Sequence, residues 1–317
     1  MVDLLQQQAA AQAAAASPAI HTVELAKRYG RTVALAGLSM TVPRGEVFGF
    51  LGPNGAGKTT AVKLLLGLVP PTSGEGWLLG HPVGSVEGRR RVGYLPELFR
   101  YQPWLSGREV LALHCELMGL PRAGWKEEID LSLHTSGLGA RADDKVREYS
   151  KGMQQRLGLG AALLGSPELV LLDEPTSALD PIGRHDVREI IHIVRERGAA
   201  VFLNSHLLTE VEMVCDRVAM VDHGRVIATG TLDELLGGHA CRFRVAGLTP
   251  QQRHSLSHFG EMQDDGEWMR LLRLEPESVP DVVAEVVGMG GRVYAVEPRV
   301  RTLEDRFLEL LRAEPGE

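Results

Sequence analysis

The segment Gly52–Thr60 (GPNGAGKTT) constrains the possible folds of this chain more than any other feature. It follows the apolar run Glu46–Leu51 and precedes the helical pattern Ala61–Leu68. The spacing GxxxxGK[ST] needs this context, because its glycines let backbone N–H groups turn toward phosphates and the next helix presents its positive end. A glycine-rich turn without a ligand is the alternative. We interpret the segment as a strand, a phosphate loop and a helix that bind a nucleoside triphosphate.

Two side chains of this loop have expected partners on the nucleotide. The Lys58 ammonium is expected to reach the terminal phosphates and to take part in catalysis, and the Thr59 hydroxyl is expected to bind Mg²⁺. The predicted nucleotide-binding residues of the loop are Gly52, Pro53, Asn54, Gly55, Ala56, Gly57, Lys58, Thr59 and Thr60.

A second apolar run, Leu169–Leu172, ends in two adjacent carboxylates, Asp173 and Glu174. Buried acids are costly unless a charge or a reaction needs them, although Asp-Glu-Pro could also be a simple turn into solvent. Successive side chains of a strand point to opposite faces, so we expect the two carboxylates to have different targets. Beside a phosphate loop, we expect Asp173 to hold the hydration shell of Mg²⁺ and Glu174 to address the attacking water.

Continuous apolar strands separated by helical patterns predict an α/β fold. The runs Glu46–Leu51, Leu169–Leu172 and Ala200–Leu203 do not alternate, as expected for parallel strands buried on both faces. Strand patterns are missing from about residue 99 to residue 164, where Ser106–Glu109 has the form of a capping box at the start of an amphipathic helix. This stretch is predicted to be a helical insertion.

After Gly237 and Gly238 the pattern changes, and residues 239–317 are predicted to be a small α+β domain. Its expected strands are Cys241–Val245, Trp268–Leu274 and Arg292–Val296, and its expected helices begin at Thr249, Ser278 and Thr302. Residues 1–19 are rich in alanine and glutamine, so they are interpreted as a low-complexity tail. They lack the basic start of a signal peptide. The main domain is then 20–238. No window is apolar enough to span a bilayer, so any membrane-spanning part would belong to another chain.

Composition limits the classes of protein that fit. The 317 residues allow two domains, and 44% hydrophobic with 24% charged residues is ordinary for a globular protein. The net charge of -7 argues against a nucleic-acid partner, and the basic cluster Arg89–Arg91 is interpreted as a solvated surface. Cys115, Cys215 and Cys241 are widely spaced without a CxxC pair, which favours a reducing cytoplasm.

Four segments together closely resemble an ATP-binding cassette (ABC) ATPase: Gly52–Thr60, Tyr149–Arg156 (YSKGMQQR), Leu171–Asp180 (LLDEPTSALD) and Asn204–His206. The resemblance covers about residues 20 to 236. It implies a three-layer P-loop domain with an antiparallel β subdomain and a helical subdomain, and it implies ATP and Mg²⁺ as cofactors. No NKxD motif for guanine is present.

The resemblance also assigns roles to residues outside the loop. Tyr29 matches the aromatic residue that stacks on adenine. Glu97 stands where most cassettes carry a glutamine that contacts the metal ion or the attacking water. It is therefore counted with Thr59 and Asp173 as a metal-binding residue, and it adds charge near the metal. His206 matches the switch histidine that contacts the γ-phosphate, and it is predicted to be catalytic with Glu174.

The segment Tyr149–Arg156 matches the signature loop of the family, whose Ser150 and Gly152 reach the γ-phosphate in the opposite subunit. Lys151 and Met153 depart from the usual Ser-Gly-Gly-Gln, but the backbone N–H groups and the helix N-terminus remain able to bind phosphate. Asp180 matches the loop that crosses to the other subunit and helps to align Glu174.

One loop and one signature in a chain imply a head-to-tail dimer, formed with a second copy or a related subunit, that completes two ATP sites. The expected location is the cytoplasmic face of the membrane, bound through an integral membrane permease. The aromatic segment Phe99–Trp104 lies where this family docks its permease, although packing of the helical subdomain would explain it equally. Three segments look like those of ATPase subunits that serve exporters of drugs, lipids or glycans: Gly93–Glu97, Ser150–Met153 and the C-terminal extension. An ABC importer and a soluble, non-transport ABC ATPase remain alternatives.

Overall fold

The computed structural model describes residues 17–177, 179–237, 240–299 and 302–313. The chain divides after Thr229 into two units, which are described separately. Most of the predicted tail lies outside the described residues, as does Ala178 of the LLDEPTSALD segment and Gly238 at the predicted boundary. The assignment of domains to 20–238 and 239–317 therefore stays a prediction.

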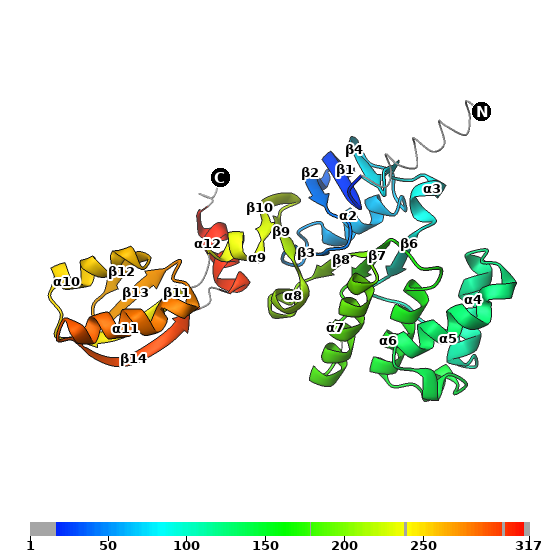
Figure 1. Cartoon of the computed structure of the whole chain (residues 1–317). Helices are drawn as coiled ribbons and strands as arrows, with labels where there is room; N and C mark the ends of the chain where they lie inside the picture. Colours follow the sequence, from blue (N-terminus) through cyan, green and yellow to red (C-terminus); the bar gives the residue numbers. More distant parts are fainter. Residues whose placement is uncertain (1–16, 178, 238–239, 300–301, 314–317) are drawn as a thin grey trace, which may run out of the picture. The chain divides into compact units, whose positions relative to one another are not determined.

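A six-stranded sheet forms the centre of the first unit, in the order β10-β9-β3-β8-β7-β6 (Figure 1). Its strands are β3 (Val47–Leu51), β6 (Val92–Leu95), β7 (Leu169–Asp173), β8 (Ala200–Ser205), β9 (Arg217–Asp222) and β10 (Arg225–Thr231). The pairs β3 with β8, β3 with β9, β6 with β7, and β7 with β8 are parallel. Every residue of β3, β7 and β8 is buried, which explains their continuous apolar sequences and confirms the three predicted strands.

A four-stranded sheet in the order β2-β1-β4-β5 forms the antiparallel subdomain of this unit. Its elements are β1 (Ile20–Tyr29), β2 (Thr32–Val42), β4 (Ser73–Leu78), β5 (His81–Pro82) and the short helix α3 (Val86–Arg89). Helix α2 (Lys58–Leu65) contributes Ala61 and Leu65 to one apolar core that contains Leu25 of β1, Phe48 of β3 and Phe202 of β8. The α/β fold with an antiparallel subdomain is thereby confirmed.

Helix α7 (Pro181–Glu196) packs on the central sheet, and α8 (Leu208–Val214) follows β8. The amphipathic pattern of α7 places Val187, Ile190, Ile191 and Val194 on its buried face. The exposed opposite side carries charged residues, so the helix covers the sheet and faces water at the same time.

The predicted helical insertion lies between β6 and β7. It contains α4 (Gly107–Leu117), α5 (Trp125–Thr135), α6 (Lys151–Ala162) and the short 3-10 turns Arg122–Gly124, Gly139–Arg141 and Val146–Glu148. These helices share a separate apolar core built around Leu111, Leu133 and Leu157. Figure 1 shows them gathered at one end of the first unit. The region without strand patterns was therefore interpreted correctly.

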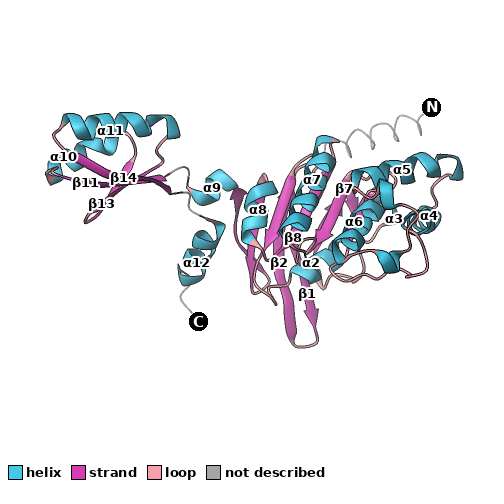
Figure 2. Ribbon diagram, turned by 90° about the horizontal axis from the view of Figure 1, so that it is seen from below, coloured by secondary structure: helices cyan, strands magenta, loops and turns pink. Residues whose placement is uncertain are grey.

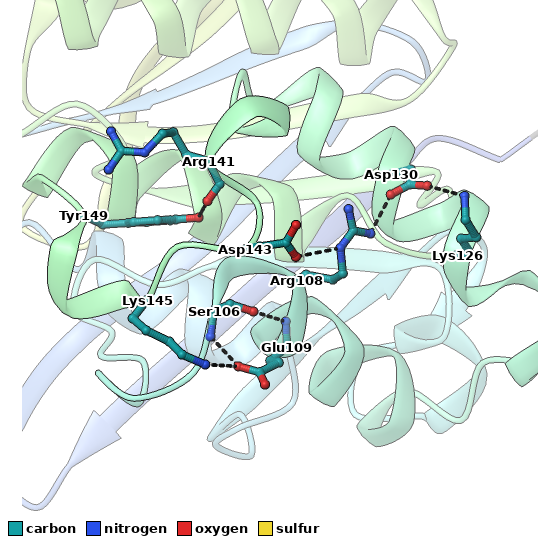
Figure 3. Close-up of polar contacts among 9 residues, drawn as sticks. All are labelled: Ser106, Arg108, Glu109, Lys126, Asp130, Arg141, Asp143, Lys145 and Tyr149. Carbon is teal, nitrogen blue, oxygen red and sulfur yellow. Dashed lines mark hydrogen bonds and ion pairs between the residues drawn. The ribbon is translucent and has the colours of Figure 1, made fainter.

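The capping box that the sequence predicts at the start of α4 is present (Figure 3). The Glu109 backbone N–H donates to the Ser106 hydroxyl over 3.2 Å, and the Ser106 N–H donates to the Glu109 carboxylate over 2.6 Å. The Lys145 ammonium donates to the same carboxylate over 3.0 Å, and these contacts lower the pKa of Glu109. The network joins the first turn of α4 to the segment that leads toward α6.

The second unit contains a four-stranded antiparallel sheet in the order β12-β13-β11-β14. Its strands are β11 (Ala240–Ala246), β12 (Glu261–Asp265), β13 (Trp268–Leu272) and β14 (Arg292–Arg299). Its helices are α9 (Leu232–Leu236), α10 (Pro250–Ser255), α11 (Val279–Gly288) and α12 (Leu303–Ala313), with 3-10 turns at Leu256–His258 and Pro276–Ser278. In Figure 2, α10 and α11 lie on one face of the sheet.

Two sequence expectations for this second unit need correction. Strand β12 was not predicted, because its sequence EMQDD is polar and it lies at the edge of the sheet. The predicted strand Trp268–Leu274 ends at Leu272, because Arg273 takes a left-handed conformation with φ of 57°.

Within the described ranges, no helix combines the length and the apolar content that crossing a bilayer requires.

Replacing Ser106 with alanine is expected to reduce the free energy of unfolding by about 1 kcal/mol, because the first turn of α4 loses its cap. Urea unfolding followed by circular dichroism measures the loss, and hydrogen exchange of residues 107–117 should localise it. Ser257→Ala, at an exposed serine, is the control and should change the free energy by less than about 0.5 kcal/mol. Equal stability of the two variants would contradict the importance of this cap.

Candidate nucleotide-binding site

The loops that follow the carboxyl ends of the parallel strands line an open cavity of about 370 Å³, together with the start of β2 and the first turn of α2. Predicted site residues that line it are Asn54, Gly55, Gly57, Lys58, Thr59, Thr60, Glu97, Glu174 and His206. Other residues that line it are Thr32, Val33, Ala34 and Asn204. Segments far apart in the sequence thus meet at the edge of the sheet where α/β proteins bind their ligands.

The phosphate loop begins directly after β3, and its last three residues, Lys58–Thr60, form the first turn of α2. Gly57 has φ of 97°, and a β-carbon there would lie 2.3 Å from the Ala34 carbonyl oxygen, so only glycine fits. A β-carbon on Gly52 would lie 2.3 Å from the Val221 carbonyl oxygen. No side chain caps the N-terminus of α2, and its first turn has no acidic residue. Its backbone N–H groups are therefore available to phosphate.

Lys58 is a buried cation at the base of this cavity. Its ammonium donates to the Gly52 carbonyl oxygen over 2.8 Å and to the Pro53 carbonyl oxygen over 3.2 Å. Burial lowers the pKa of Lys58, and the negative charges of Glu174, Asp173 and Glu97 oppose that change, Glu174 most strongly. The lysine is thus held by its own loop, close to three carboxylates.

The two adjacent carboxylates have different partners in the structure, and strand alternation is not the reason. Asp173 ends β7, whereas Glu174 lies beyond the strand in a left-handed conformation with φ of 53°. Strand alternation therefore does not set the direction of Glu174, and that part of the sequence argument was wrong. The Asp173 carboxylate accepts a hydrogen bond from the Asn204 side-chain amide. Glu174 Oε2 lies 2.7 Å from His206 Nδ1.

Burial is the main influence on the acidic part of the site. It raises the pKa of Asp173, a change that the Asn204 hydrogen bond opposes and that the charges of Glu97 and Glu174 reinforce. Burial, with Asp173 and Glu97 nearby, also raises the pKa of Tyr94 to about 12.

An ionised Glu174 only accepts hydrogen bonds, so its contact with His206 places a proton on His206 Nδ1.

The other predicted site residues do not line this cavity. Tyr29 is exposed at the end of β1, where the Lys27 ammonium lies 5.1 Å from the centre of its ring. The Ser150 hydroxyl caps α6 by accepting from the Met153 backbone N–H over 3.2 Å. Gly152 follows in the first turn of α6.

Asp180 is an exposed cap of α7, where its carboxylate accepts from the Gly183 N–H over 2.8 Å. The signature loop, in turn, is anchored by Tyr149. The Tyr149 hydroxyl donates to the Arg141 carbonyl oxygen over 2.7 Å (Figure 3). In a single chain, the signature and Asp180 therefore stabilise helices and do not complete the cavity.

Sequence reasoning named Asn204 only as part of a motif and missed its contact with Asp173. The signal available was a polar residue directly after the apolar residues Ala200–Leu203, on the strand that ends near His206. Thr32, Val33 and Ala34 had no such signal, because packing of the antiparallel sheet brings them to the cavity.

The chemistry of these residues fits a magnesium ion. Thr59, Asp173 and Glu97 offer hard oxygen ligands, and Asn204 Oδ1 is a buried acceptor that receives no hydrogen bond from a described residue. Among the described residues, no group of three or more His, Cys, Asp or Glu side chains could hold a metal ion. Magnesium does not need such a group, because it usually keeps several waters and binds one or two carboxylates with substrate phosphates.

The strand, the phosphate loop, the following helix and the carboxylates at the end of β7 define a P-loop nucleoside triphosphatase. A family model described as "ABC transporter" matches residues 35–177. An uncharacterized ABC transporter ATP-binding protein of Nostoc sp. is 42% identical over 282 residues, which are 88% of this chain and 83% of that protein. The chain belongs to the ABC transporter ATP-binding proteins, a family of ATPases whose hydrolysis of ATP drives transport.

Two further comparisons describe the chain's similarities within that family. Nod factor export ATP-binding protein I of Rhizobium sp. is 35% identical, and the match covers 92% of this chain and 96% of that protein. The structure of CbiO1 from Clostridium perfringens, part of the ABC transporter complex CbiONQ, is similar with a TM-score of 0.62 and 28% identity. That match covers 69% of this chain and 90% of the other.

Replacing Lys58 with alanine is expected to weaken ATP binding about 10- to 100-fold, because the terminal phosphates lose a charged hydrogen-bond donor. Titration calorimetry of the purified chain with ATP measures the change. The control is Lys63→Ala, because Lys63 is exposed on the same helix and should leave the affinity unchanged. Unchanged affinity of Lys58→Ala would count against the loop assignment.

Proposed function

We propose that this ABC ATPase works as a head-to-tail dimer that hydrolyses ATP with Mg²⁺ and drives a separate membrane permease, as an exporter of drugs, lipids or glycans. The proposed location is the cytoplasmic face of the membrane, through the permease. The observation that carries the proposal is the shared cavity of Lys58, Glu174 and His206, which the signature loop of the same chain does not line.

Hydrolysis needs an oriented water and neutralised phosphate charge. In this proposal, Glu174 accepts a proton from the attacking water. His206 holds the Glu174 carboxylate in place until His206 itself contacts the γ-phosphate. Lys58 and the N–H groups at the start of α2 bind the phosphates. Magnesium, when bound, neutralises charge between the phosphates, and Thr59, Asp173 and Glu97 are the residues that would hold it.

The dimer is supported by the position of the signature loop. Ser150, Gly152 and Asp180 are absent from the residues that line the cavity, so one chain supplies only part of the predicted site. A second copy, turned by a two-fold axis, would bring its own signature to this cavity and receive the same contribution in return. Tyr29 is exposed and therefore accessible for stacking on adenine.

Export is supported by the likeness to the Nod factor export protein, which extends over nearly the whole of both chains. It is also supported by the Ser150–Met153 variant of the signature, which resembles ATPase subunits of bacterial exporters. The transported molecule is proposed only as a class, because the cavity described above binds nucleotide and not cargo.

A permease contact is supported by two exposed apolar side chains near the helical subdomain. Leu98 is 86% exposed and Trp104 is 65% exposed. Phe99 and Tyr101, by contrast, pack on each other with ring centres 5.3 Å apart, and Tyr101 also contacts His114 of α4. Phe99 and Tyr101 therefore pack within the chain, and only the exposed Leu98 and Trp104 are proposed to contact the permease.

Replacing Glu174 with glutamine is expected to lower ATP turnover by about 100-fold or more, because the attacking water loses its base. ATP binding should persist, so dimers should accumulate with ATP and be visible by size-exclusion chromatography with light scattering. Phosphate release measures turnover, and Glu189→Gln on the exposed side of α7 is the control. Retention of wild-type turnover by Glu174→Gln would refute the role of Glu174.

Replacing Trp104 with alanine is expected to remove association with the permease while basal ATPase activity stays intact. The measurement is co-purification of the integral membrane protein that accompanies the tagged chain, together with phosphate release in detergent. Leu117→Ala is a matched control, because Leu117 is 76% exposed in the same subdomain. If Trp104→Ala retains the permease as well as the control does, this docking site is wrong.

A further inference from the structure

Asn204 occupies a central position at the carboxyl end of β8. It is 1% exposed, and it lies in register with Asp173 of β7 on one side and Phe50 of β3 on the other. It also borders the nucleotide cavity, two residues before His206. The other residues of β8 up to this point are apolar, so the polar side chain begins where the cavity begins.

Two contacts connect Asn204 to the Asp173 carboxylate and to the backbone of Glu174. Its side-chain amide nitrogen donates to Asp173 Oδ1, and its backbone carbonyl oxygen accepts from the Glu174 N–H over 2.9 Å. An ionised carboxylate only accepts hydrogen bonds, so the NH₂ group of Asn204 must be the part that faces Asp173. The amide oxygen then points away from Asp173.

Among the described residues, that amide oxygen makes no hydrogen bond that would stabilise the fold. Asn204 Oδ1 is buried and accepts no hydrogen bond from any residue that the structure describes. A buried acceptor without a donor destabilises a folded protein, and leucine has a similar size without this cost. A water that arrives with the nucleotide would supply the missing donor, because water donates two hydrogen bonds.

We propose that Asn204 is a positioning residue for ATP hydrolysis, whose amide nitrogen fixes the Asp173 carboxylate for magnesium and whose Oδ1 accepts from a water brought in with the nucleotide. Residues that hold a metal ligand by a hydrogen bond orient it, and replacing them typically weakens metal binding about 10- to 100-fold. This inference rests on the proposed role of Asp173, and it adds a residue that acts through Asp173 without touching the phosphates.

The test measures metal binding apart from hydrolysis. Mn²⁺ replaces Mg²⁺ and is detected by electron paramagnetic resonance in the full chain bound to a non-hydrolysable ATP analogue. Asn204→Leu should weaken Mn²⁺ binding about 10- to 100-fold, whereas affinity for the analogue without metal should stay within about twofold. In ATPase assays, the same variant should need more Mg²⁺ and show a lower kcat with little change in KM for ATP.

Asn204→Ser should recover much of the lost metal affinity, because its hydroxyl can still donate toward Asp173. Ser205→Ala, at the neighbouring buried polar residue whose hydroxyl accepts from the Leu207 N–H over 3.1 Å, should leave Mn²⁺ affinity unchanged. If Asn204→Leu does not fold, Asn204→Ala takes its place, and a loss of roughly threefold or more is expected from it.

Asp173→Ala separates the two ways in which the experiment can fail. If Asp173→Ala weakens Mn²⁺ binding but Asn204→Leu does not, the inference about Asn204 is overturned and the role of Asp173 stands. If neither variant weakens it, the metal-binding role of Asp173 is itself wrong. Equal weakening by Asn204→Leu and Ser205→Ala would show a general effect of the strand end, and it would also overturn the inference.

Discussion

The parallel pairing of β8 with both β3 and β7 holds the functional site together. Because β8 lies between them, the phosphate loop after β3 and the carboxylates at the end of β7 lie on its two sides. The register places Leu51 beside Ser205, and Asp173 beside Asn204. Burial of these apolar strands on both faces supplies the stability that keeps polar side chains in position at their ends.

The charges of the cavity then decide how a nucleotide can bind. Glu97, Asp173 and Glu174 surround a single lysine, Lys58, whose own pKa burial lowers. A nucleoside triphosphate is strongly anionic, so its phosphates would be repelled by three carboxylates. A divalent cation that binds both the phosphates and the carboxylates removes this repulsion, which supports the proposal that ATP and magnesium bind together.

Features that depend only on residues close together in the sequence could be predicted from the sequence. The spacing of the phosphate loop, the continuous apolar runs and the capping box at Ser106 each follow from local rules, and the described elements agree with them. Polar strand β12 could not be found this way, because it is recognisable only by its pairing with β13. The left-handed conformation of Glu174 likewise depends on tertiary structure, because its N–H must reach the Asn204 carbonyl oxygen.

The caps of α6 and α7 bear on how two copies would associate. Ser150 and Asp180 accept hydrogen bonds from N–H groups of their own helices, so these two caps need no second subunit. The first turn of α6 has no acidic residue, and one cap satisfies only one of the N–H groups there. The remaining N–H groups, with Lys151, are suited to a phosphate brought by another subunit. In the proposed dimer, ATP would then join the two subunits without refolding, and hydrolysis would remove the γ-phosphate that makes this contact.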